Sequence, residues 1–536
     1  MAKGAERVAE EIRAGETALG IEFGSTRIKA VLVDADNETL AVGTHDWENS
    51  FVDGHWTYGD DEVFAGLASC YASLKTNVEE RHGVRLTRLG ALGISAMMHG
   101  YLAFDVEGGL LVPFRTWRDT TTGAASAELT RLLRFHMPER WSASHVYQAI
   151  LDGEEHVARI SSLTTLAGYV HRRLTGEHVL SVGDASGMFP IDAATHTYDA
   201  GMLEKFDALV AEKGVTWRLE DLLPRVLVAG EQAGTLTEAG ALLLDPTGEL
   251  EPGCVLCPPE GDAGTGMIAT NSVRPRTGNV SAGTSVFSMV VLERPLADAT
   301  RPEIDLVTTP AGDPVAMVHC NNCTSDINAW IDLLCDYSRV MGRPVDKGEA
   351  YTRLFREALA GDKDAGGLVP LPFVSGETVM GVQTGYPLLL RRPNARLSIA
   401  NFMRASIMAS FGALAAGNEA LREEGVAIDK LYGHGGIFKT AGVAQSLLAA
   451  ALDAPVTVME TAGEGGAWGQ AVAANYMLRR EPGETLPDYL DRRVFGSVDG
   501  TTLAPDPADV EGYEAFLSAF RRADAAELAA ERAFAE

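Results

Sequence analysis

The stretch Leu19-Gly-Ile-Glu-Phe-Gly24-Ser25-Thr26-Arg27-Ile-Lys29-Ala-Val-Leu-Val33 joins two apolar runs through a small tip that carries hydroxyl groups. The same pattern returns far along the chain, in Gly278-Asn-Val-Ser-Ala-Gly283-Thr284-Ser285-Val-Phe-Ser-Met-Val-Val-Leu292. Each stretch is typical of a β-hairpin. Glycine lets a backbone approach an anion closely, and exposed N–H groups and hydroxyls then donate hydrogen bonds to phosphate oxygens. One such tip in each half of the chain predicts a nucleotide polyphosphate held from two sides.

Length and element order predict two domains around a cleft. A chain of 536 residues exceeds what a single hydrophobic core usually supports. Apolar strand-like runs alternate with helix-like stretches in both halves, which indicates α/β architecture. We place the boundary where the hairpin pattern restarts, which divides the chain into residues 1–275 and 276–536. The two similar hairpins indicate a duplicated core with the active site between its halves.

Charge and hydropathy limit the partners. The formal net charge of −29 argues against a nucleic acid or an anionic membrane, because both require a positive protein surface. No apolar run approaches the ~18 residues that cross a bilayer, and the N-terminus has no apolar signal-peptide core. We therefore expect a cytoplasmic protein that binds small molecules through local groups. The oligomeric state stays open, a homodimer included.

Several single elements can be predicted from periodicity and turn signals. We expect a buried strand at 89–95, helices at 62–80, 124–135, 163–174 and 397–422, and a solvated helix from Glu511 onward. The pairs Cys254/Cys257 and Cys320/Cys323 have the CxxC spacing of some metal sites. Residues three apart on a strand face opposite ways, however, so Cys254 and Cys257 would not converge on one metal. We expect buried reduced thiols at these positions.

One carboxylate stands out in the segment Gly261-Asp262-Ala-Gly264-Thr-Gly266, between an apparent strand and a helix that we expect to begin near Met267. Ligands of α/β proteins bind at strand C-termini and helix N-termini, which favours a functional role. Asp262 could equally cap the following helix, and this segment alone does not decide between the two roles.

Three further sites have a functional and a structural interpretation. Gly435 and Gly436 could face a flat nucleobase or form an ordinary turn between a strand and a helix. His99 follows a buried strand and could bind a polar ligand or be a structural histidine. Trp117 and Asp119 combine an apolar face with polar groups, as sugar sites and surface turns both do.

Taken in order, these segments resemble the FGGY family of carbohydrate kinases over about residues 19–476. The stretches Leu163–Glu177 and Gly183–Gly187 are similar to further motifs of that family. The resemblance implies two domains of the actin-like ATPase (ribonuclease H-like) fold, with ATP and Mg²⁺ as cofactors and a sugar as acceptor. It also implies that Asp262 is the catalytic base, which accepts the proton of a sugar hydroxyl during phosphoryl transfer.

The same resemblance assigns the nucleotide and metal residues. The phosphates would be held by both hairpin tips, through Gly24, Ser25, Thr26, Lys29, Gly283, Thr284 and Ser285, and the adenosine would lie along Gly435 and Gly436. The family usually has an aspartate in the first hairpin that helps to hold the metal, whereas this chain has Glu22. Glutamate keeps the charge and adds a methylene, so we expect Glu22 and Asp262 to hold Mg²⁺.

The acceptor sugar can be narrowed but not fixed. Met98-His99-Gly100 and Trp117-Arg-Asp119 resemble segments of xylulokinases, whereas Trp117–Thr121 and Ser325–Trp330 look closer to L-ribulokinases. Both imply a ketopentose phosphorylated at its terminal hydroxyl. We prefer D-xylulose, contacted by Met98, His99, Trp117, Asp119 and Asp262. L-Ribulose, glycerol and deoxyhexuloses stay open, as do two other classes of protein, an actin-like ATPase and a sugar sensor without kinase activity.

Overall fold

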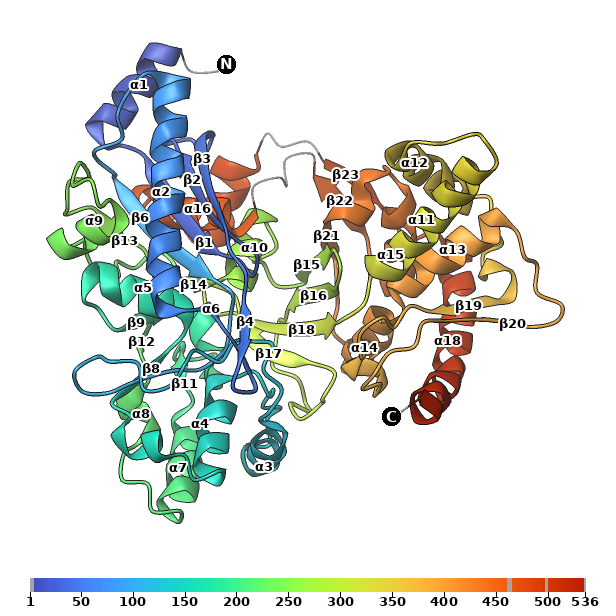
Figure 1. The fold of residues 1–536 in the computed structure, drawn as a ribbon, viewed down its shortest axis with the longest axis horizontal. Helices are drawn as coiled ribbons and strands as arrows, with labels where there is room; N and C mark the ends of the chain where they lie inside the picture. Colours follow the sequence, from blue (N-terminus) through green and yellow to red (C-terminus); the bar gives the residue numbers. More distant parts are fainter. Residues whose placement is uncertain (1–3, 460–464, 497–499, 535–536) are drawn as a thin grey trace.

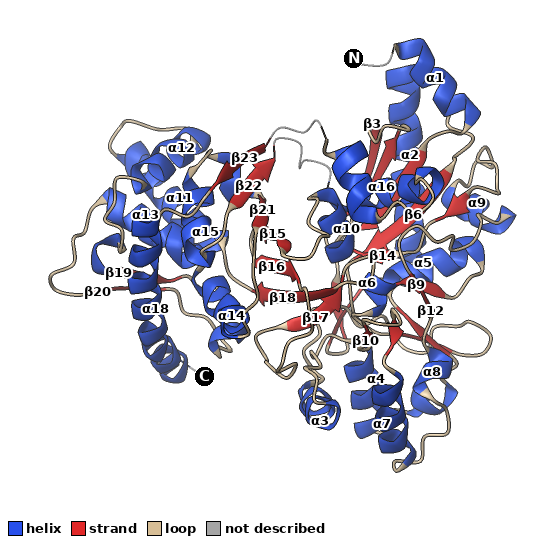
Figure 2. Ribbon diagram, turned by 180° about the vertical axis from the view of Figure 1, so that it is seen from behind, coloured by secondary structure: helices blue, strands red, loops and turns tan. Residues whose placement is uncertain are grey.

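The computed structural model describes residues 4–459, 465–496 and 500–534. Two lobes stand side by side, each built on its own β-sheet with helices on the outer faces (Figure 1). Early residues form one lobe, and most residues after about 275 form the other, as the same arrangement seen from behind shows (Figure 2). The prediction of two α/β parts is confirmed by this architecture.

The first sheet is built around the first hairpin. Its strand order is β13-β6-β1-β2-β3, and β14 also pairs with β6. Strand β1 pairs with β2 in antiparallel and with β6 in parallel orientation. The strands are β1 (Ala18–Phe23), β2 (Arg27–Val33), β3 (Thr39–Asp46), β6 (Ala91–Ala96), β13 (Val255–Leu256) and β14 (Glu260–Gly261).

The second sheet repeats this plan around the second hairpin. Its order is β17-β18-β16-β15-β21-β22-β23, and β15 has an antiparallel neighbour, β16, and a parallel neighbour, β21. The expectation of a duplicated core is therefore confirmed strand by strand. The strands are β15 (Thr277–Ala282), β16 (Val286–Val291), β17 (Asp305–Thr308), β18 (Pro314–Cys320), β21 (Lys430–His434), β22 (Val456–Met459) and β23 (Gly500–Leu503).

Two helices pack against the first sheet. Helix α10 (Asp262–Ala269) follows β14, and α16 (Gly465–Arg479) packs against α10 and against β1 and β6 of the first sheet. Gly20 permits this close approach, because a Cβ there would overlap the backbone of Ala467 and Ala471. A segment from the second half of the chain thus lies on the first sheet, and the division at residue 275 stays a prediction.

The outer helices and small strands complete the lobes. In the first lobe they are α1 (Ala5–Ala14), β4 (Ser50–Val52), β5 (His55–Thr57), α2 (Asp60–His82), β7 (Leu102–Phe104), α3 (Gly123–Leu133), α4 (Ser142–Leu151), β8 (Ser162–Thr164), α5 (Leu166–Thr175), β9 (Val179–Ser181), α6 (Val182–Ala185), β10 (Ile191–Asp192), β11 (Thr197–Tyr198), α7 (Ala200–Ala211), α8 (Leu219–Leu222), β12 (Arg225–Leu227) and α9 (Glu238–Leu244). In the second half they are α11 (Thr324–Val340), α12 (Lys347–Ala358), β19 (Leu368–Leu371), β20 (Leu388–Arg391), α13 (Ile399–Ser410), α14 (Gly412–Glu423), α15 (Val443–Leu452), α17 (Leu486–Tyr489) and α18 (Pro507–Phe534).

Four predicted elements need correction. The single helix 397–422 is wrong: α13 and α14 meet at an angle of 51°, because Phe411 between them leaves helical geometry with ψ of 3°. Helix α10 begins at Asp262, ahead of the predicted start near Met267. Helix α5 begins at Leu166, since Ser162–Thr164 form β8 and Thr165 is the N-cap of the helix. Helix α18 is not fully solvated, because Tyr513, Phe516 and Phe520 are buried on one of its faces.

Among the described residues, no single helix has the length and hydrophobicity to cross a membrane, although the bent pair α13–α14 meets both criteria when its halves are combined. The six cysteines are free thiols, and five of them are buried, as expected. Burial raises the pKa of Cys254, Cys257 and Cys323 to about 12, which keeps these thiols protonated.

Candidate active site

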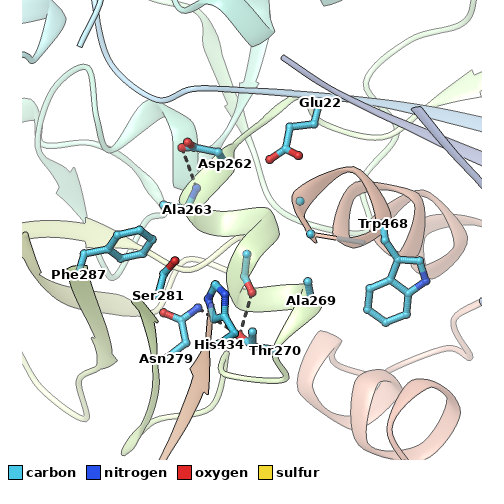
Figure 3. A pocket seen from close by; sticks show the side chains of 13 residues that line it. Glu22, Asp262, Ala263, Ala269, Thr270, Asn279, Ser281, Phe287, His434 and Trp468 are labelled. Carbon is cyan, nitrogen blue, oxygen red and sulfur yellow. Dashed lines mark hydrogen bonds between the residues drawn. The ribbon is translucent and has the colours of Figure 1, made fainter. Parts of the chain in front are cut away.

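A cavity of about 230 Å³ is lined by residues of β1, α10, β15, β16, β21 and α16. Figure 3 shows Glu22 and Asp262 along one side of it, and Phe287, Ser281 and Asn279 of the second hairpin along another. The lining residues are Glu22, Asp262, Ala263, Gly266, Ala269, Thr270, Asn279, Ser281, Phe287, His434, Gly465, Gly466 and Trp468. The two acids that the sequence singled out are thus brought into one cavity from positions 240 residues apart in the chain.

Asp262 is the first residue of α10 and its carboxylate is open to the cavity. Its Oδ1 accepts hydrogen bonds from the backbone N–H of Ala263 at 2.9 Å and of Met98 at 3.2 Å. Protein surrounds the group on its other sides, and this burial raises the pKa of Asp262 although the two N–H donors oppose the rise. The result is a fixed, accessible carboxylate that is a stronger base than an aspartate in water.

Glu22 lies on β1, directly across from Lys29 on β2. Burial and the negative charge of Asp262 raise the pKa of Glu22 to about 7, while the Ala467 N–H at the start of α16 and the Lys29 ammonium lower it. The start of α16 lies against the acid so closely that a Cβ at Gly466 would overlap its carboxylate. Two carboxylates that repel one another in a shared cavity form a local excess of negative charge, which suits a divalent cation.

Two further acids, which the sequence analysis did not single out, support the region behind Asp262. Glu260 is buried, accepts hydrogen bonds from Ser181 Oγ at 2.5 Å and from the Gly261 N–H at 2.9 Å, and has its pKa raised to about 7 by burial. Asp184 accepts a hydrogen bond from Thr165 Oγ1 at 2.6 Å, and burial raises its pKa as well. Both acids fix β14 and therefore the position of Asp262. In the sequence, Glu260 stands two residues before Asp262 at the end of a strand, with Gly261 between them. This spacing was a signal that could have identified Glu260.

The second lobe contributes a polar and an aromatic wall. Within the described residues, Oδ1 of Asn279 and Nε2 of His434 are buried without a hydrogen-bond partner, and both residues line the cavity. Phe287 lies on β16 opposite His319 on β18, and their rings stack with centroids 6.4 Å apart. Unpaired polar atoms beside an aromatic face are what a polar ligand with an apolar side would satisfy.

The predicted sugar residues divide into two groups. Met98 lies beside Asp262 and its N–H donates to that carboxylate, whereas His99, the next residue, has its Nδ1 at 3.3 Å from the carbonyl of Gly187. Burial, together with Arg140, lowers the pKa of His99 to about 3, so this imidazole is neutral. Of the predicted sugar residues only Asp262 lines the cavity; Met98, His99, Trp117 and Asp119 do not. Burial would raise the pKa of Asp119, but hydrogen bonds from Thr121 and contact with His55 lower it, so protein partners occupy this carboxylate.

The first hairpin tip is fixed by two stacked aromatic rings. Trp47 Nε1 donates to the carbonyl of Gly24 at 2.7 Å, and the Tyr58 hydroxyl donates to the carbonyl of Ser25 at 2.7 Å. The two rings stack at 4.2 Å. Because these carbonyls are held from behind, the exposed side chains of Ser25 and Thr26 stay at the surface of the tip. None of Gly24, Ser25 and Thr26 lines the cavity itself.

The second hairpin tip is tied to a helix instead. Thr324, the first residue of α11, donates from its hydroxyl to the carbonyl of Gly283 at 2.7 Å, and the Cys323 N–H donates to the carbonyl of Thr284 at 2.9 Å. Gly435 lies against this hairpin with a φ of 115°, and a Cβ there would overlap the backbone of Ala282. The cavity is lined by Ser281 and His434, which lie close in sequence to these tip and turn residues, but not by Gly283, Thr284, Ser285, Gly435 or Gly436 themselves.

The N-terminal domain of the FGGY family of carbohydrate kinases matches residues 17–245, and its C-terminal domain matches residues 278–478. These two matches lie in the order that the family requires and together cover most of the chain. The chain therefore belongs to the FGGY family of carbohydrate kinases, and the resemblance inferred from the motifs is confirmed.

Individual relatives are distant. L-fuculokinase of Escherichia coli is 22% identical over 243 residues, which are 43% of this chain and 48% of that protein. Xylulose kinase of Streptomyces coelicolor is 23% identical over 378 residues, 68% of each protein. The first curated relatives are thus matched over about half of their length. The crystal structure of xylulose kinase from Rhodospirillum rubrum has a TM-score of 0.75 at 19% identity and is covered to 99%, with 97% of this chain aligned. The predicted actin-like fold with two lobes is thereby confirmed.

Proposed function

We propose that the protein is an ATP-dependent carbohydrate kinase that phosphorylates a terminal hydroxyl of a ketopentose. The proposal rests above all on one observation: the Asp262 carboxylate is fixed by two backbone N–H groups and is open to a cavity that strands of both hairpins line. A base in that position can meet a sugar alcohol from the first lobe and a phosphate from the second. Membership of the FGGY family supports the same activity.

The chain's residues can perform the transfer as follows. Asp262 accepts the proton of the sugar hydroxyl while the hydroxyl oxygen attacks the terminal phosphorus of ATP. ADP leaves with the electron pair of the broken bond. The hairpin tips Gly24–Thr26 and Gly283–Ser285 hold the phosphates through backbone and hydroxyl donors, and Lys29 adds positive charge. His434 and Asn279 would give polar partners to the nucleotide.

Mg²⁺ fits the two carboxylates that share the cavity. Glu22 and Asp262 would hold it, with water and phosphate oxygens completing its shell, since no group of three or more His, Cys, Asp or Glu side chains in the described ranges is arranged around a metal position. When bound, Mg²⁺ neutralises phosphate charge and orients the terminal phosphoryl group. Closure of the two lobes around both substrates would exclude water and limit wasteful hydrolysis of ATP.

D-Xylulose is the acceptor that we favour. Met98 lies beside the proposed base, and His99, the next residue, is a neutral imidazole that can exchange hydrogen bonds with sugar hydroxyls. Trp117 and Asp119 would join this site if the hydrogen bonds of Asp119 to Thr121 and His55 are exchanged for bonds to sugar. The matched relatives carry the names xylulose kinase and L-fuculokinase, so a ketose is the common element.

A substrate panel tests the proposal. ADP formation would be measured with ATP and Mg²⁺ in the presence of D-xylulose, D-ribulose, L-ribulose, L-xylulose, L-fuculose, gluconate and glycerol, and the phosphorylated product would be identified by mass spectrometry. We expect the largest kcat/KM for D-xylulose. A preference for another ketose would keep the kinase and correct its acceptor. ATP turnover that no sugar changes would instead indicate an actin-like ATPase, and sugar binding without product would indicate a sensor.

A further inference from the structure

A buried acid in the second half of the chain belongs to a loop that takes no part in the proposed reaction. The loop spans residues 374–386, none of which lines the cavity, and we call it the Glu377 loop. Glu377 is fully buried, and this burial raises its pKa to about 7, although hydrogen bonds from Asn322 and from nearby backbone N–H groups oppose the rise. Burying an acid is costly unless hydrogen bonds replace the lost water, so the partners of Glu377 indicate what it holds in place.

The main partner is Asn322, which lies two residues beyond the end of β18. Glu377 Oε2 accepts hydrogen bonds from the backbone N–H of Asn322 at 3.2 Å and from its Nδ2 at 3.0 Å. Ser375 of the same loop binds the rest of the amide: its N–H donates to Asn322 Oδ1 at 2.9 Å, and its carbonyl accepts from Nδ2 at 3.0 Å. The Glu377 loop therefore fixes both the backbone and the side chain of residue 322.

The two residues that follow Asn322 hold the tip of the second hairpin. The Cys323 N–H donates to the carbonyl of Thr284 at 2.9 Å, and Thr324 donates to the carbonyl of Gly283 from its hydroxyl at 2.7 Å and from its N–H at 3.2 Å. Gly283 and Thr284 are themselves exposed. The place of this exposed tip thus depends on residues 322–324, and a misplacement of about 1 Å in a binding group can cost about 100-fold in rate.

Helix α18 supports the Glu377 loop from its other end. Glu531 Oε1 accepts hydrogen bonds from the backbone N–H groups of Gln383 at 3.0 Å and Thr384 at 2.6 Å, and Glu527 Oε1 accepts one from the Tyr386 N–H at 2.5 Å. Figure 1 shows α18 beside β19 and β20 in the second lobe, and α18 packs on β19. A loop held at both ends is a rigid support for Asn322.

We propose that Glu377 is a positioning residue for ATP, which acts through Asn322 to fix the second hairpin tip where the tip binds phosphate. The inference rests on the proposed function, because it takes this tip as a phosphate site. It goes beyond that function by naming a residue outside the cavity on which the affinity for ATP depends. Glu377 and Asn322 form one unit, so the loss of either should have the same effect.

The test measures the dissociation constant of ATP with Mg²⁺ by calorimetry on the full chain, without sugar. Glu377→Leu and Asn322→Leu should each raise this constant about tenfold, since each removes the bonds that fix residue 322. The double variant should show about the same tenfold rise, because the two residues act through one contact. A rise of about 100-fold in the double variant, the product of two independent effects, would overturn the proposal. Unchanged constants in the single variants would overturn it as well.

The matched control is Asn401→Leu. Asn401 is another buried amide of the second half: its Oδ1 accepts the N–H of Asp362 at 2.7 Å, and its Nδ2 donates to the carboxylate of Asp362 at 2.9 Å. This contact includes neither the Glu377 loop nor the hairpin. Asn401→Leu should therefore lower the melting temperature about as much as Asn322→Leu but leave the dissociation constant of ATP unchanged. A tenfold rise in the control would show that lost stability alone weakens ATP binding, and the proposal would be wrong.

A milder pair of variants keeps the test decisive if the buried variants do not fold. Thr324→Val removes the hydroxyl that donates to Gly283, whereas Thr324→Ser keeps it. The dissociation constant of ATP should rise about threefold in the first variant and stay at the wild-type value in the second. Wild-type affinity in both variants would contradict the proposed support of the tip.

Catalysis is measured separately, so that the two proposals can fail independently. In Glu377→Leu the KM for ATP should rise with the dissociation constant, while the KM for D-xylulose stays within about twofold of the wild type. If the wild type binds ATP but phosphorylates no sugar, the proposed function fails, and a tenfold weaker binding of ATP in Glu377→Leu still supports the role of Glu377. If the wild type is a kinase whose affinity for ATP does not depend on Glu377, the positioning role is wrong and the kinase stands.

Discussion

The two hairpins have the same strand plan but different chemistry. In each, the first strand pairs antiparallel with the second and parallel with a strand that comes later in the chain. The first hairpin carries Glu22 and Lys29 across from one another and faces the helix that begins at Asp262. In the second, the residues that line the cavity are Asn279, Ser281 and Phe287, which are uncharged.

This difference shows how a duplicated fold can divide one reaction. In the proposed reaction, the charged groups assigned to proton transfer and metal binding, Glu22 and Asp262, come from the first hairpin and the start of α10, whereas the second lobe would supply hydroxyls, amides and an aromatic face. One consequence is that the lobes need to be brought together for the reaction, and neither could perform it alone. Substitutions in the first lobe should therefore cost more activity than matched substitutions in the second.

The largest effect is expected at Asp262. Asp262→Asn preserves the shape of the side chain but removes the base, so kcat should fall by about 100-fold or more while ATP and sugar still bind. Turnover would be measured by a coupled ADP assay and binding by calorimetry. If the variant keeps wild-type turnover, Asp262 is not the base, and another group in the cavity accepts the proton.

Glu22 should determine the dependence on Mg²⁺. Glu22→Gln removes one of the two expected carboxylate ligands, and we expect the Mg²⁺ concentration for half-maximal activity to rise about tenfold. Because the pKa of Glu22 is about 7, the wild type should bind Mg²⁺ better as pH rises through this value. The variant should lose this pH dependence in Mg²⁺ titrations. An unchanged metal dependence would make Glu22 a structural residue.

The same residue predicts a pH effect on stability without metal. The unfolded glutamate releases its proton near its ordinary pKa of 4.5, whereas the folded one keeps it to about 7. Stability from this group is therefore complete below about pH 4.5 and is lost as pH rises to about 7. The melting temperature of Glu22→Gln minus that of the wild type should be larger at about pH 8 than at about pH 5. The opposite trend would show that Glu22 is not buried next to Asp262.

A smaller effect is expected from the aromatic wall of the second lobe. Phe287→Leu and His319→Gln alter a stacked pair of rings at the cavity wall, and His319 lies close enough to His99 to lower its pKa beyond the effect of burial, so the KM for sugar should rise about fivefold while the KM for ATP stays constant. His45→Gln is the matched control, since His45 binds Ser69 on the first lobe at 3.0 Å, outside the cavity. A rise in the KM for ATP instead would assign this wall to the nucleotide.

The smallest effects compare the hairpin tips directly. Ser25→Ala and Thr284→Ala each remove one hydroxyl but leave the backbone donors in place, and both should raise the KM for ATP by about threefold or less. Steady-state kinetics at saturating sugar measures this change. If the KM for ATP rises by different factors in the two variants, the larger rise identifies the tip that contributes more to phosphate binding. A rise of about 100-fold in either variant would contradict the dominance of backbone donors.

Much of the fold could be predicted because its signals are local. Apolar runs around small tips predicted both hairpins, and periodicity predicted each end of α2 and α3 to within two residues. The same reasoning failed at Phe411, where the predicted helix 397–422 bends. Apolar periodicity continues through that residue, and only packing against the rest of the lobe shows that α13 and α14 take different directions.

The site could be predicted only in part. Asp262 and Glu22 were found because each lies at a recognisable turn in the sequence. The roles of Glu260, His319 and Ala467 were not predicted, because they depend on neighbours far away in the chain: Ser181 for Glu260, Phe287 for His319 and Glu22 for Ala467. Asp119 was expected at the sugar, and the structure shows its carboxylate bound to Thr121 and His55.

The sequence by itself determined the class of fold, the two hairpins and the acid Asp262 that follows a strand, since strand and turn preferences act between residues that are close in the chain. Only the tertiary structure decided that Glu22 and Asp262 share one cavity, that their pKa values rise, and that α16 returns to the first sheet. The physical reason is that burial and charge repulsion depend on distance in space, which a chain acquires only when its sheets pack.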